Sequence, residues 1–356
     1  MESLDVRNQK IIKAVIEKAN RVCPESLALL GIYGSFATGD YHEKSDLDLL
    51  VLINDNNGWQ LGCTFIQDDW EVGHDIYCTT WEDLEEASLY NNPNISKLMD
   101  SEIVYCADEK YIERLKSLRE KVKNILSAPL SKEDYIKAEN MMKEAEHFYL
   151  SAVISEEMTD IWKQAGYTVY YIENAIAMLN KKYFRFGTKH AYEELELMEN
   201  KPDMLCGMIE NVLSSDTAGQ VKESLTILVR ETMRIFRKMK TTVLSEKKAV
   251  TADSINGTYE EMFSNWRNKM YLASNENNRH LALMSLVSLS AMISDISEGT
   301  DIDDYNALKC YNPQNLRNTA AAFDDLLNDY LKEYQKAGLR AERYKDIDSF
   351  VQHYLG

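Results

Sequence analysis

Residues 27–53 read LALLGIYGSFATGDYHEKSDLDLLVLI, and this stretch decides the fold of the N-terminal part of the chain. Its two apolar runs, 27–33 and 46–53, have the length of buried strands, and a turn that contains two glycines separates them. Alternate side chains on a strand point to opposite faces. Asp46 and Asp48 are therefore predicted to share one face, with the leucines between and after them in the core.

Two aspartates on one face, next to a glycine-serine turn, predict a site for a metal ion and phosphates. Mg²⁺ prefers oxygen ligands, which Asp46 and Asp48 supply. Gly34 lets the chain approach a phosphate closely, and the Ser35 hydroxyl and the following backbone N–H groups are donors for phosphate oxygens. Phosphoryl or nucleotidyl transfer needs this combination, because metal ions neutralise and orient the phosphates and activate the attacking oxygen.

A third carboxylate, Asp75, would complete a site for two metal ions, which lie roughly 4 Å apart in such enzymes. Asp75 falls in the segment EVGHDIYC, residues 71–78, within a strand expected over 71–79. We expect this strand to pair beside the strand of Asp46 and Asp48. Because its neighbours in sequence are apolar, we do not expect Asp75 to be an ordinary surface residue.

The motif Gly34-Ser35, followed by Ser45-Asp46-Leu47-Asp48, resembles the GS…SDxD pattern of the polymerase-β-like nucleotidyltransferase superfamily. A small head followed by helices is similar to the layout of its small-molecule branch, the aminoglycoside and lincosamide nucleotidyltransferases of bacteria. The resemblance of the motifs covers about residues 27–80, and the resemblance of the domain extends to about residue 126.

The resemblance implies a function for each motif residue. Ser35 binds the triphosphate of the co-substrate, for which ATP is favoured, and Asp46 and Asp48 bind Mg²⁺. In some relatives the acid at the third position is the general base for the acceptor hydroxyl. The resulting candidates are Asp46, Asp48 and Asp75 for catalysis and for two Mg²⁺ ions, and Gly34, Ser35 and Ser45 for nucleotide binding.

Glu173 is the alternative candidate for the general base. Helical spacing places it on one face with Tyr170, Asn174 and Ala177, in a segment far from the motif. A base on this helix would reach over a cleft between head and body, where ligand sites often form. An ordinary semi-polar helix face would show the same pattern, so the choice between Asp75 and Glu173 stays open.

The remainder of the chain predicts helices. Five prolines and 14 glycines in 356 residues favour long helices over turn-rich β architecture. The predicted fold class is α+β, a small nucleotidyltransferase head with a mixed sheet and flanking helices, followed by a mostly α-helical body. Three domains are expected: the head at 1–127, a helical substrate-binding domain at 132–244, and a further helical bundle at 255–356, separate from or continuous with the second. Helical patterns cover about 132–156, 160–182, 189–199, 203–213, 218–243, 258–274, 277–297, 313–336 and 339–355.

The charge of the chain limits its partners. Lys and Arg number 40 against 58 Asp and Glu, which gives a net charge of −18. Residues 51–100 hold ten acids and a single base, Lys97, and so carry half of that net charge. We therefore expect no nucleic-acid partner, because phosphate contacts need basic surface. An acidic cleft instead suits metal cations and a cationic acceptor such as an aminoglycoside.

The location is expected to be cytoplasmic. The sequence has no stretch of 18 uninterrupted apolar residues and no signal-peptide pattern, so neither a membrane nor secretion is expected. The six cysteines are dispersed without a CxxC pair, which indicates reduced thiols. A homodimer is a further expectation.

The leading hypothesis is transfer of AMP, or another NMP, from an NTP to a hydroxyl of a small molecule, with release of pyrophosphate. One alternative is a protein-modifying nucleotidyltransferase of the toxin–antitoxin type, which a shallow, exposed site would favour. The other is a non-catalytic nucleotide sensor. Two weaker signals are set aside: the spacing of Arg185 and His190, found on a helix in some ribonucleases, because Gly187 interrupts it, and a zinc pair at His74 and Cys78.

Overall fold

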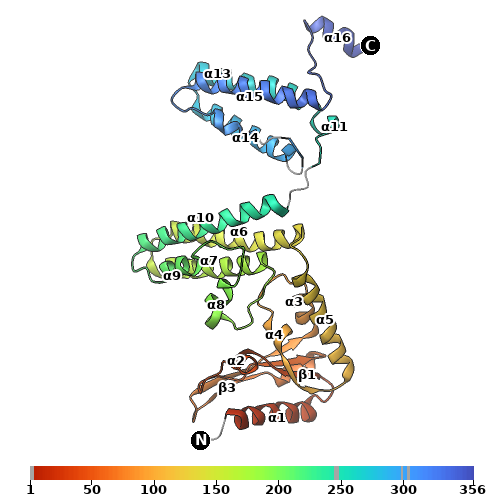
Figure 1. Cartoon of the computed structure of the whole chain (residues 1–356), viewed down its shortest axis with the longest axis vertical. Helices are drawn as coiled ribbons and strands as arrows, with labels where there is room; N and C mark the ends of the chain where they lie inside the picture. Colours follow the sequence, from red (N-terminus) through yellow and green to blue (C-terminus); the bar gives the residue numbers. More distant parts are fainter. Residues whose placement is uncertain (1–3, 244–247, 298–299, 303–304) are drawn as a thin grey trace. The chain divides into compact units, whose positions relative to one another are not determined.

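The computed structural model describes residues 4–243, 248–297, 300–302 and 305–356. The chain divides into two compact units, Met1–Val243 and Leu244–Gly356, which have separate hydrophobic cores. The head and the first helical part lie together in the first unit, and the expected division into three domains stays a prediction. A four-stranded sheet followed by helices confirms the α+β fold class (Figure 1).

The main sheet of the first unit has the strand order β5-β2-β1-β6. Its central strand β1 pairs antiparallel with both β2 and β6, while β2 pairs parallel with β5. This is the mixed sheet that the sequence predicts. The strands are β1 (Leu27–Ile32), β2 (Leu49–Ile53), β5 (Cys78–Thr80) and β6 (Glu102–Cys106).

Two predicted strands differ from the observed ones. The strand expected from Asp46 begins at Leu49, although the backbone ahead of it stays close to β1, since the Tyr33 N–H donates to the Asp48 carbonyl at 3.1 Å. The strand expected over 71–79 is two strands, β4 (Val72–Ile76) and β5. Of these two strands, only β5 pairs with β2. The prediction that the strand of Asp75 lies beside β2 is therefore wrong.

The strand β4 pairs instead with β3 (Cys63–Gln67) in a separate two-stranded antiparallel sheet. The sequence analysis missed β3. Four of its five residues are exposed, so it lacks the buried apolar run or alternation that marks a strand against a core.

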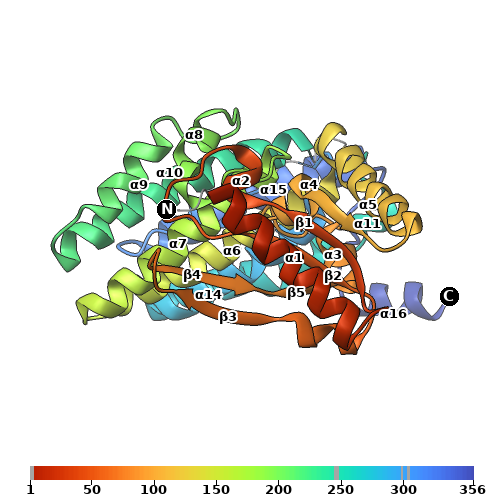
Figure 2. The same cartoon turned by 90° about the horizontal axis from the view of Figure 1, so that it is seen from below.

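Helices cover both faces of the main sheet. On one face α1 (Leu4–Val22) crosses the strands and packs Ile12 and Val15 against Val51 (Figure 2). The other face, with Leu50, contributes to a larger core that contains α3 (Trp81–Ala87), α4 (Ser96–Asp100) and α5 (Glu109–Ser127). Thr80 caps α3 through a capping box with Asp83.

The helical part of the first unit shares that larger core. One continuous cluster of buried side chains runs from the sheet through α5 into the following helices, so no gap separates head and body. The buried Tyr90 of the head supports this join, because its hydroxyl donates to the Lys182 carbonyl at 2.5 Å. The helices are α6 (Lys132–Ile154), α7 (Met158–Leu179), α8 (Ala191–Glu196), α9 (Leu205–Leu213) and α10 (Ala218–Val243).

The described residues of the second unit form helices joined by non-helical segments, together with one isolated β-bridge between Lys248 and Thr300. The helix expected over 258–274 consists of three successive elements: α12 (Thr258–Glu261), a π-helix at Met262–Arg267, and α13 (Asn268–Glu276). The helix expected from 339 begins only at Ile347, because the preceding segment is held extended against α12, with the Glu342 N–H donating to Glu260 at 2.7 Å. The helices are α11 (Ala252–Ile255), α12 (Thr258–Glu261), α13 (Asn268–Glu276), α14 (Arg279–Ser297), α15 (Leu316–Lys336) and α16 (Ile347–Leu355).

One helix in the described part of the chain, α14, is long and apolar enough to cross a membrane by length and composition alone. A helix in the core of a globular unit passes the same test. In the structure α14 packs Ala282, Leu286, Leu289 and Ile293 into the core of the second unit, which accounts for the apolar residues on that face.

Candidate active site

Gly34 and Asp48 touch at the edge of the main sheet where β1 ends and β2 begins. Gly34 begins α2 (Gly34–Thr38) with a φ of +67°, a left-handed conformation that favours glycine. A Cβ at this position would lie 2.0 Å from Asp48 Oδ2. The glycine is therefore needed both for the turn and for the close approach of the Gly34-Ser35 backbone to the carboxylate.

Asp46 and Asp48 point to the same side, as predicted. Both are half-buried, whereas Ser45, Leu47 and Leu49 between and beside them are buried. The alternation therefore begins before the strand itself. It holds because the backbone of this segment is already extended alongside the end of β1.

The two carboxylates repel each other. The pKa of Asp48 is raised to about 6, mainly by burial and also by the negative charge of Asp46, while the positive charge of Lys97 acts in the opposite direction. Two oxygen-donor groups with uncompensated charge fit a hard divalent cation such as Mg²⁺. Asp46 and Asp48 are therefore the residues that would hold such an ion.

Asp75 does not join this pair in a three-ligand group. It is an exposed residue of β4, and in the described part of the chain no three Asp, Glu, His or Cys side chains are placed to hold one metal ion. Asp75 still lies close enough for its charge to act on Tyr33, whose pKa burial and the three aspartates all raise. The expected third carboxylate is thus near the site but is not gathered with Asp46 and Asp48.

Ser35 and Ser45 have different surroundings. Ser35 is half-buried in the first turn of α2, where its carbonyl accepts the Asp40 N–H at 2.9 Å. Ser45 is buried, and its hydroxyl oxygen accepts the His42 N–H at 2.9 Å, which closes the turn before Asp46. The structure therefore shows a turn-forming contact for Ser45 and leaves its nucleotide-binding role a prediction.

The sequence analysis missed Arg7. This arginine of α1 is 3% exposed, and its Nη2 donates to the Ser45 carbonyl at 2.8 Å. Its guanidinium also lies over the rings of Phe36 and Trp70. Arg7 thereby fixes the segment that carries Asp46, a role that one charged residue on an amphipathic helix does not reveal in sequence.

Lys97 was also missed as a site residue, although the sequence marks it as the single base between residues 51 and 100. Its Nζ lies 5.3 Å from the centre of the Tyr33 ring and 5.6 Å from that of Tyr77. The structure therefore places the positive charge of Lys97 at the same edge of the main sheet as Asp48.

Glu173 lines a small cleft, of about 40 Å³, between the head and the helical part of the first unit. Burial raises the pKa of this half-buried carboxyl to about 7. Its neighbours Tyr170 and Asn174 line the same cleft, as the predicted helix face requires, whereas Ala177 is buried in the core.

The cleft also takes residues from the head. Asn94 Nδ2 donates to Asn174 Oδ1 at 3.1 Å, which joins the segment before α4 to α7. Asn174 is 1% exposed, and its own Nδ2 has no partner within the described residues. An unpartnered buried donor beside a carboxyl of raised pKa is suited to a polar group of a ligand.

Asp40 connects the Gly34-Ser35 turn with this cleft. This residue follows the Gly34-Ser35 turn, and its carboxylate contacts Lys189 Nζ at 2.8 Å and His190 Nε2 at 2.7 Å. Lys189 and His190 belong to a 3₁₀ helix at Thr188–His190, beside the residues that line the cleft. Gly187, with a φ of +67°, lies between α7 and this 3₁₀ helix, so Arg185 and His190 do not share a helix, as expected from the sequence.

His74 and Cys78 are core residues. His74 is buried and stacks on Phe65, while its Nε2 lies 3.3 Å from Gln67 Oε1. Cys78 is buried, and its thiol donates to the Gly58 carbonyl. Both side chains therefore pack in the interior, and the structure gives no support for a zinc pair.

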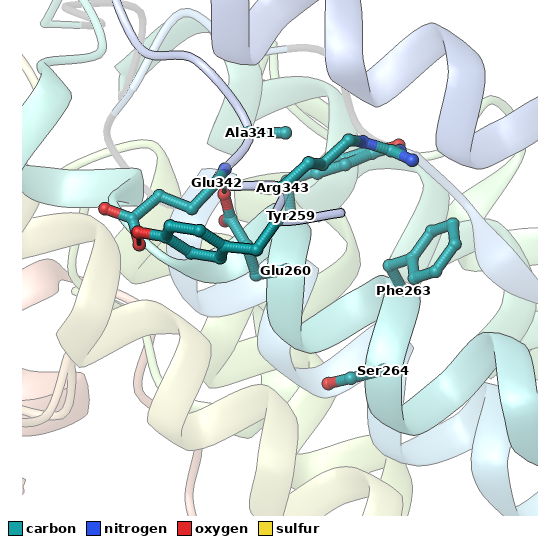
Figure 3. A pocket seen from close by; sticks show the side chains of 8 residues that line it. Tyr259, Glu260, Phe263, Ser264, Ala341, Glu342 and Arg343 are labelled. Atoms are coloured by element: carbon teal, nitrogen blue, oxygen red, sulfur yellow. Dashed lines mark hydrogen bonds between the residues drawn. The ribbon is translucent and has the colours of Figure 1, made fainter. Parts of the chain in front are cut away.

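A larger cavity, of about 520 Å³, lies in the second unit (Figure 3). Tyr259, Phe263 and Arg343 line it together with the segment that precedes α16. Arg343 Nη2 donates to Tyr259 Oη at 3.0 Å, and both oxygens of Glu260 accept hydrogen bonds from the protein. The polar groups that line this cavity thus mostly bond one another. The candidate active site is instead the carboxylate edge of the first unit, which consists of Gly34, Asp46 and Asp48.

Among the comparisons with known proteins, a family model covers this site. Residues 9–131 match the family model described as a nucleotidyltransferase domain. That match contains the main sheet and the Asp46–Asp48 pair, so the N-terminal part is a nucleotidyltransferase domain and the chain is an enzyme of the transferase class.

A solved structure of a nucleotidyltransferase-like protein from Exiguobacterium sibiricum 255-15 is similar to this chain at 11% identity and a TM-score of 0.36. The likeness covers 67% of this chain and 77% of that one, and at this level no functional conclusion follows from it. The comparison with curated proteins finds no match.

Proposed function

We propose that the protein transfers AMP, or another NMP, from an NTP to a hydroxyl of a small molecule and releases pyrophosphate, with Mg²⁺ bound by Asp46 and Asp48. The observation that carries this proposal is the contact of Gly34 with Asp48. It places the backbone N–H groups of a turn suited to phosphate directly beside a carboxylate suited to a metal ion. The metal ions would neutralise the phosphates and orient them for in-line attack.

Glu173 is favoured over Asp75 as the general base. A base works best when its pKa lies near the working pH, and burial raises the pKa of Glu173 to about 7. Asn174 beside it offers a donor for the acceptor oxygen, while Glu173 takes the acceptor proton. The contact of Asp40 with His190 supports a functional connection between this cleft and the nucleotide loop.

An aminoglycoside-like cation remains the favoured acceptor, which would make antibiotic resistance the biological role. The acidic stretch 51–100 supports it, since facing carboxylates offset the cost of desolvating a polycation. We further propose a cytoplasmic protein, supported by six free cysteines, that needs neither nucleic acid nor a membrane and forms a homodimer.

A protein acceptor is the second candidate. The Glu173 cleft is small, about 40 Å³, and the side chains of Trp162, Tyr167 and Tyr170 on the same helix are largely exposed. A shallow site with exposed aromatic residues suits the side chain of a partner protein better than a fully enclosed drug-sized molecule.

Incubation with Mg²⁺ and each α-labelled NTP tests the proposal, with aminoglycosides, lincosamides and lysate proteins as acceptors. Asp48→Asn is expected to lower transfer by about a thousandfold or more, since it removes a metal ligand. Asp329→Asn, on the exposed surface of α15, is the control for the same chemical change. Label on a small molecule supports the leading proposal and label on a protein supports the second. Binding of NTP without any transfer would reject both in favour of a sensor.

A further inference from the structure

The single base of the stretch 51–100 is held beside the candidate nucleotide loop. Lys97 lies on α4, and α4 packs against α2, the short helix that begins with Gly34-Ser35. Its side chain is half-buried. An acidic segment therefore places its one cation where a nucleotide would bind.

Two aromatic rings hold the ammonium group of Lys97. Nζ lies 5.3 Å from the centre of the Tyr33 ring and 5.6 Å from that of Tyr77. Tyr33 directly precedes Gly34, and Tyr77 follows Asp75 by two positions. Ring faces attract a cation without using its N–H donors, so the three donors of Lys97 stay available for oxygen atoms.

Within the described residues, no carboxylate lies within 4.0 Å of this ammonium to form an ion pair. The charges of Asp48, Asp83 and Asp75 nevertheless favour its positive form, against burial, which lowers the pKa of Lys97. The other cation near the carboxylate pair, Arg7, is buried and already donates to the Ser45 carbonyl. Lys97 is thus the cation placed to meet an incoming anion.

We propose that the Lys97 ammonium binds the β- and γ-phosphate oxygens of the nucleoside triphosphate and stays with the pyrophosphate as it leaves. The inference rests on the proposed function and names a phosphate-binding residue for it. In the transfer, the acceptor oxygen bonds to the α-phosphorus and the bond from that phosphorus to the bridging oxygen breaks. The electron pair goes to pyrophosphate and the acceptor proton goes to the general base. Lys97 offsets the negative charge that the departing oxygen gains.

Calorimetric titration with MgATP, magnesium pyrophosphate and AMP tests the assignment. Lys97→Met removes the charge, and Lys97→Gln keeps a polar side chain in case the first variant does not fold. Both are expected to raise the Kd of MgATP and of pyrophosphate about tenfold or more, because a charge-assisted hydrogen bond is lost. The Kd of AMP, which lacks the β- and γ-phosphates, should stay unchanged.

Lys121→Met is the matched control. This lysine of α5 donates to Ser88 Oγ at 3.2 Å, and its substitution should change none of the three affinities. Equal affinities for ATP and pyrophosphate in the Lys97 variants and in the wild type would overturn the assignment. An equal loss for AMP would also overturn it, because it indicates a disturbed loop rather than a lost phosphate contact. A wild type that binds none of the three probes would instead reject the proposed function.

Discussion

The carboxylate edge of the sheet, formed by Gly34, Asp46 and Asp48, and the Glu173 cleft each hold a carboxyl group of raised pKa. Burial is the main cause in both, but only Asp48 also has a second carboxylate beside it. At the edge, burial and the charge of Asp46 both act on Asp48, and its pKa rises to about 6. In the cleft, burial alone raises the pKa of Glu173 to about 7. A buried carboxyl with a second carboxylate beside it is stabilised by a cation that binds both, whereas a buried carboxyl that stands alone is a proton acceptor near neutral pH.

The difference shows that the surroundings, rather than the residue type, separate a metal ligand from a base. It also predicts that variants at the two places fail in different ways. Loss at the edge should remove the binding of nucleotide and metal, while loss in the cleft should leave binding intact and slow the chemical step.

Among the variants that follow, substitution in the cleft should have the largest effect. Glu173→Gln is expected to lower kcat by about 10²–10⁴, the usual contribution of a general base, with the NTP affinity unchanged. A base must be deprotonated, so wild-type activity should rise with pH through about 7 and level off above it. The pH dependence of kcat measures this rise, which Glu173→Gln should abolish. If Asp75→Asn removed the rise instead, the base would be Asp75.

Gly34 and Gly187 have the same φ of +67°, so alanine variants of the two distinguish backbone strain from a steric clash of the added Cβ. Gly34→Ala places a Cβ 2.0 Å from Asp48 Oδ2, whereas a Cβ on Gly187 meets no atom within 4 Å. Both variants should lose about 1 kcal/mol from the left-handed backbone. Only Gly34→Ala should lose more, together with MgATP binding. Urea unfolding and titration measure the two effects, and equal losses of stability would show that Asp48 moves aside without cost.

The stability of the apo protein should depend on Asp48 with a definite sign. Its pKa is raised on folding, so the folded state holds its proton longer, and stability is lost as pH rises from about 4 to about 6. Asp48→Asn has no such loss and should be more stable than the wild type by about 1 kcal/mol at pH 7, after discounting for solvent screening. Urea unfolding in EDTA at pH 4 and pH 7 measures it. A variant less stable at pH 7 than the wild type would contradict the repulsion.

The smallest effect is expected where the two regions meet. Asp40→Asn removes the ion pairs with Lys189 and His190, which lie at an exposed contact, so KM should rise only about threefold. The hydrogen bond that the His190 ring donates to the Asp40 carboxylate raises the pKa of His190, so the variant should lower that pKa. An NMR titration of the histidine ring measures the shift, and an unchanged pKa would show that the contact does not form in solution.

Much of the head could be predicted from local pattern. The buried strands β1 and β2 are made almost entirely of apolar residues, and the alternation of Asp46 and Asp48 with leucines places both aspartates on the side away from the core. The exposed strand β3 and the pairing of Asp75 could not, because an edge strand without a buried face has no pattern that chooses its partner.

The sequence by itself determined the class of fold, the glycine-serine turn and the carboxylate pair, because each depends on residues within a few positions of one another. The tertiary contacts alone establish that Asp75 lies outside the Asp46–Asp48 pair, that Arg7 holds the Ser45 turn, and that Lys97 lies close enough to Asp48 for its charge to act on it. These relations join residues tens of positions apart, and packing between α1, α4 and the sheet creates them. Local propensity specifies elements, while the chemistry of the site depends on which side chains packing brings together.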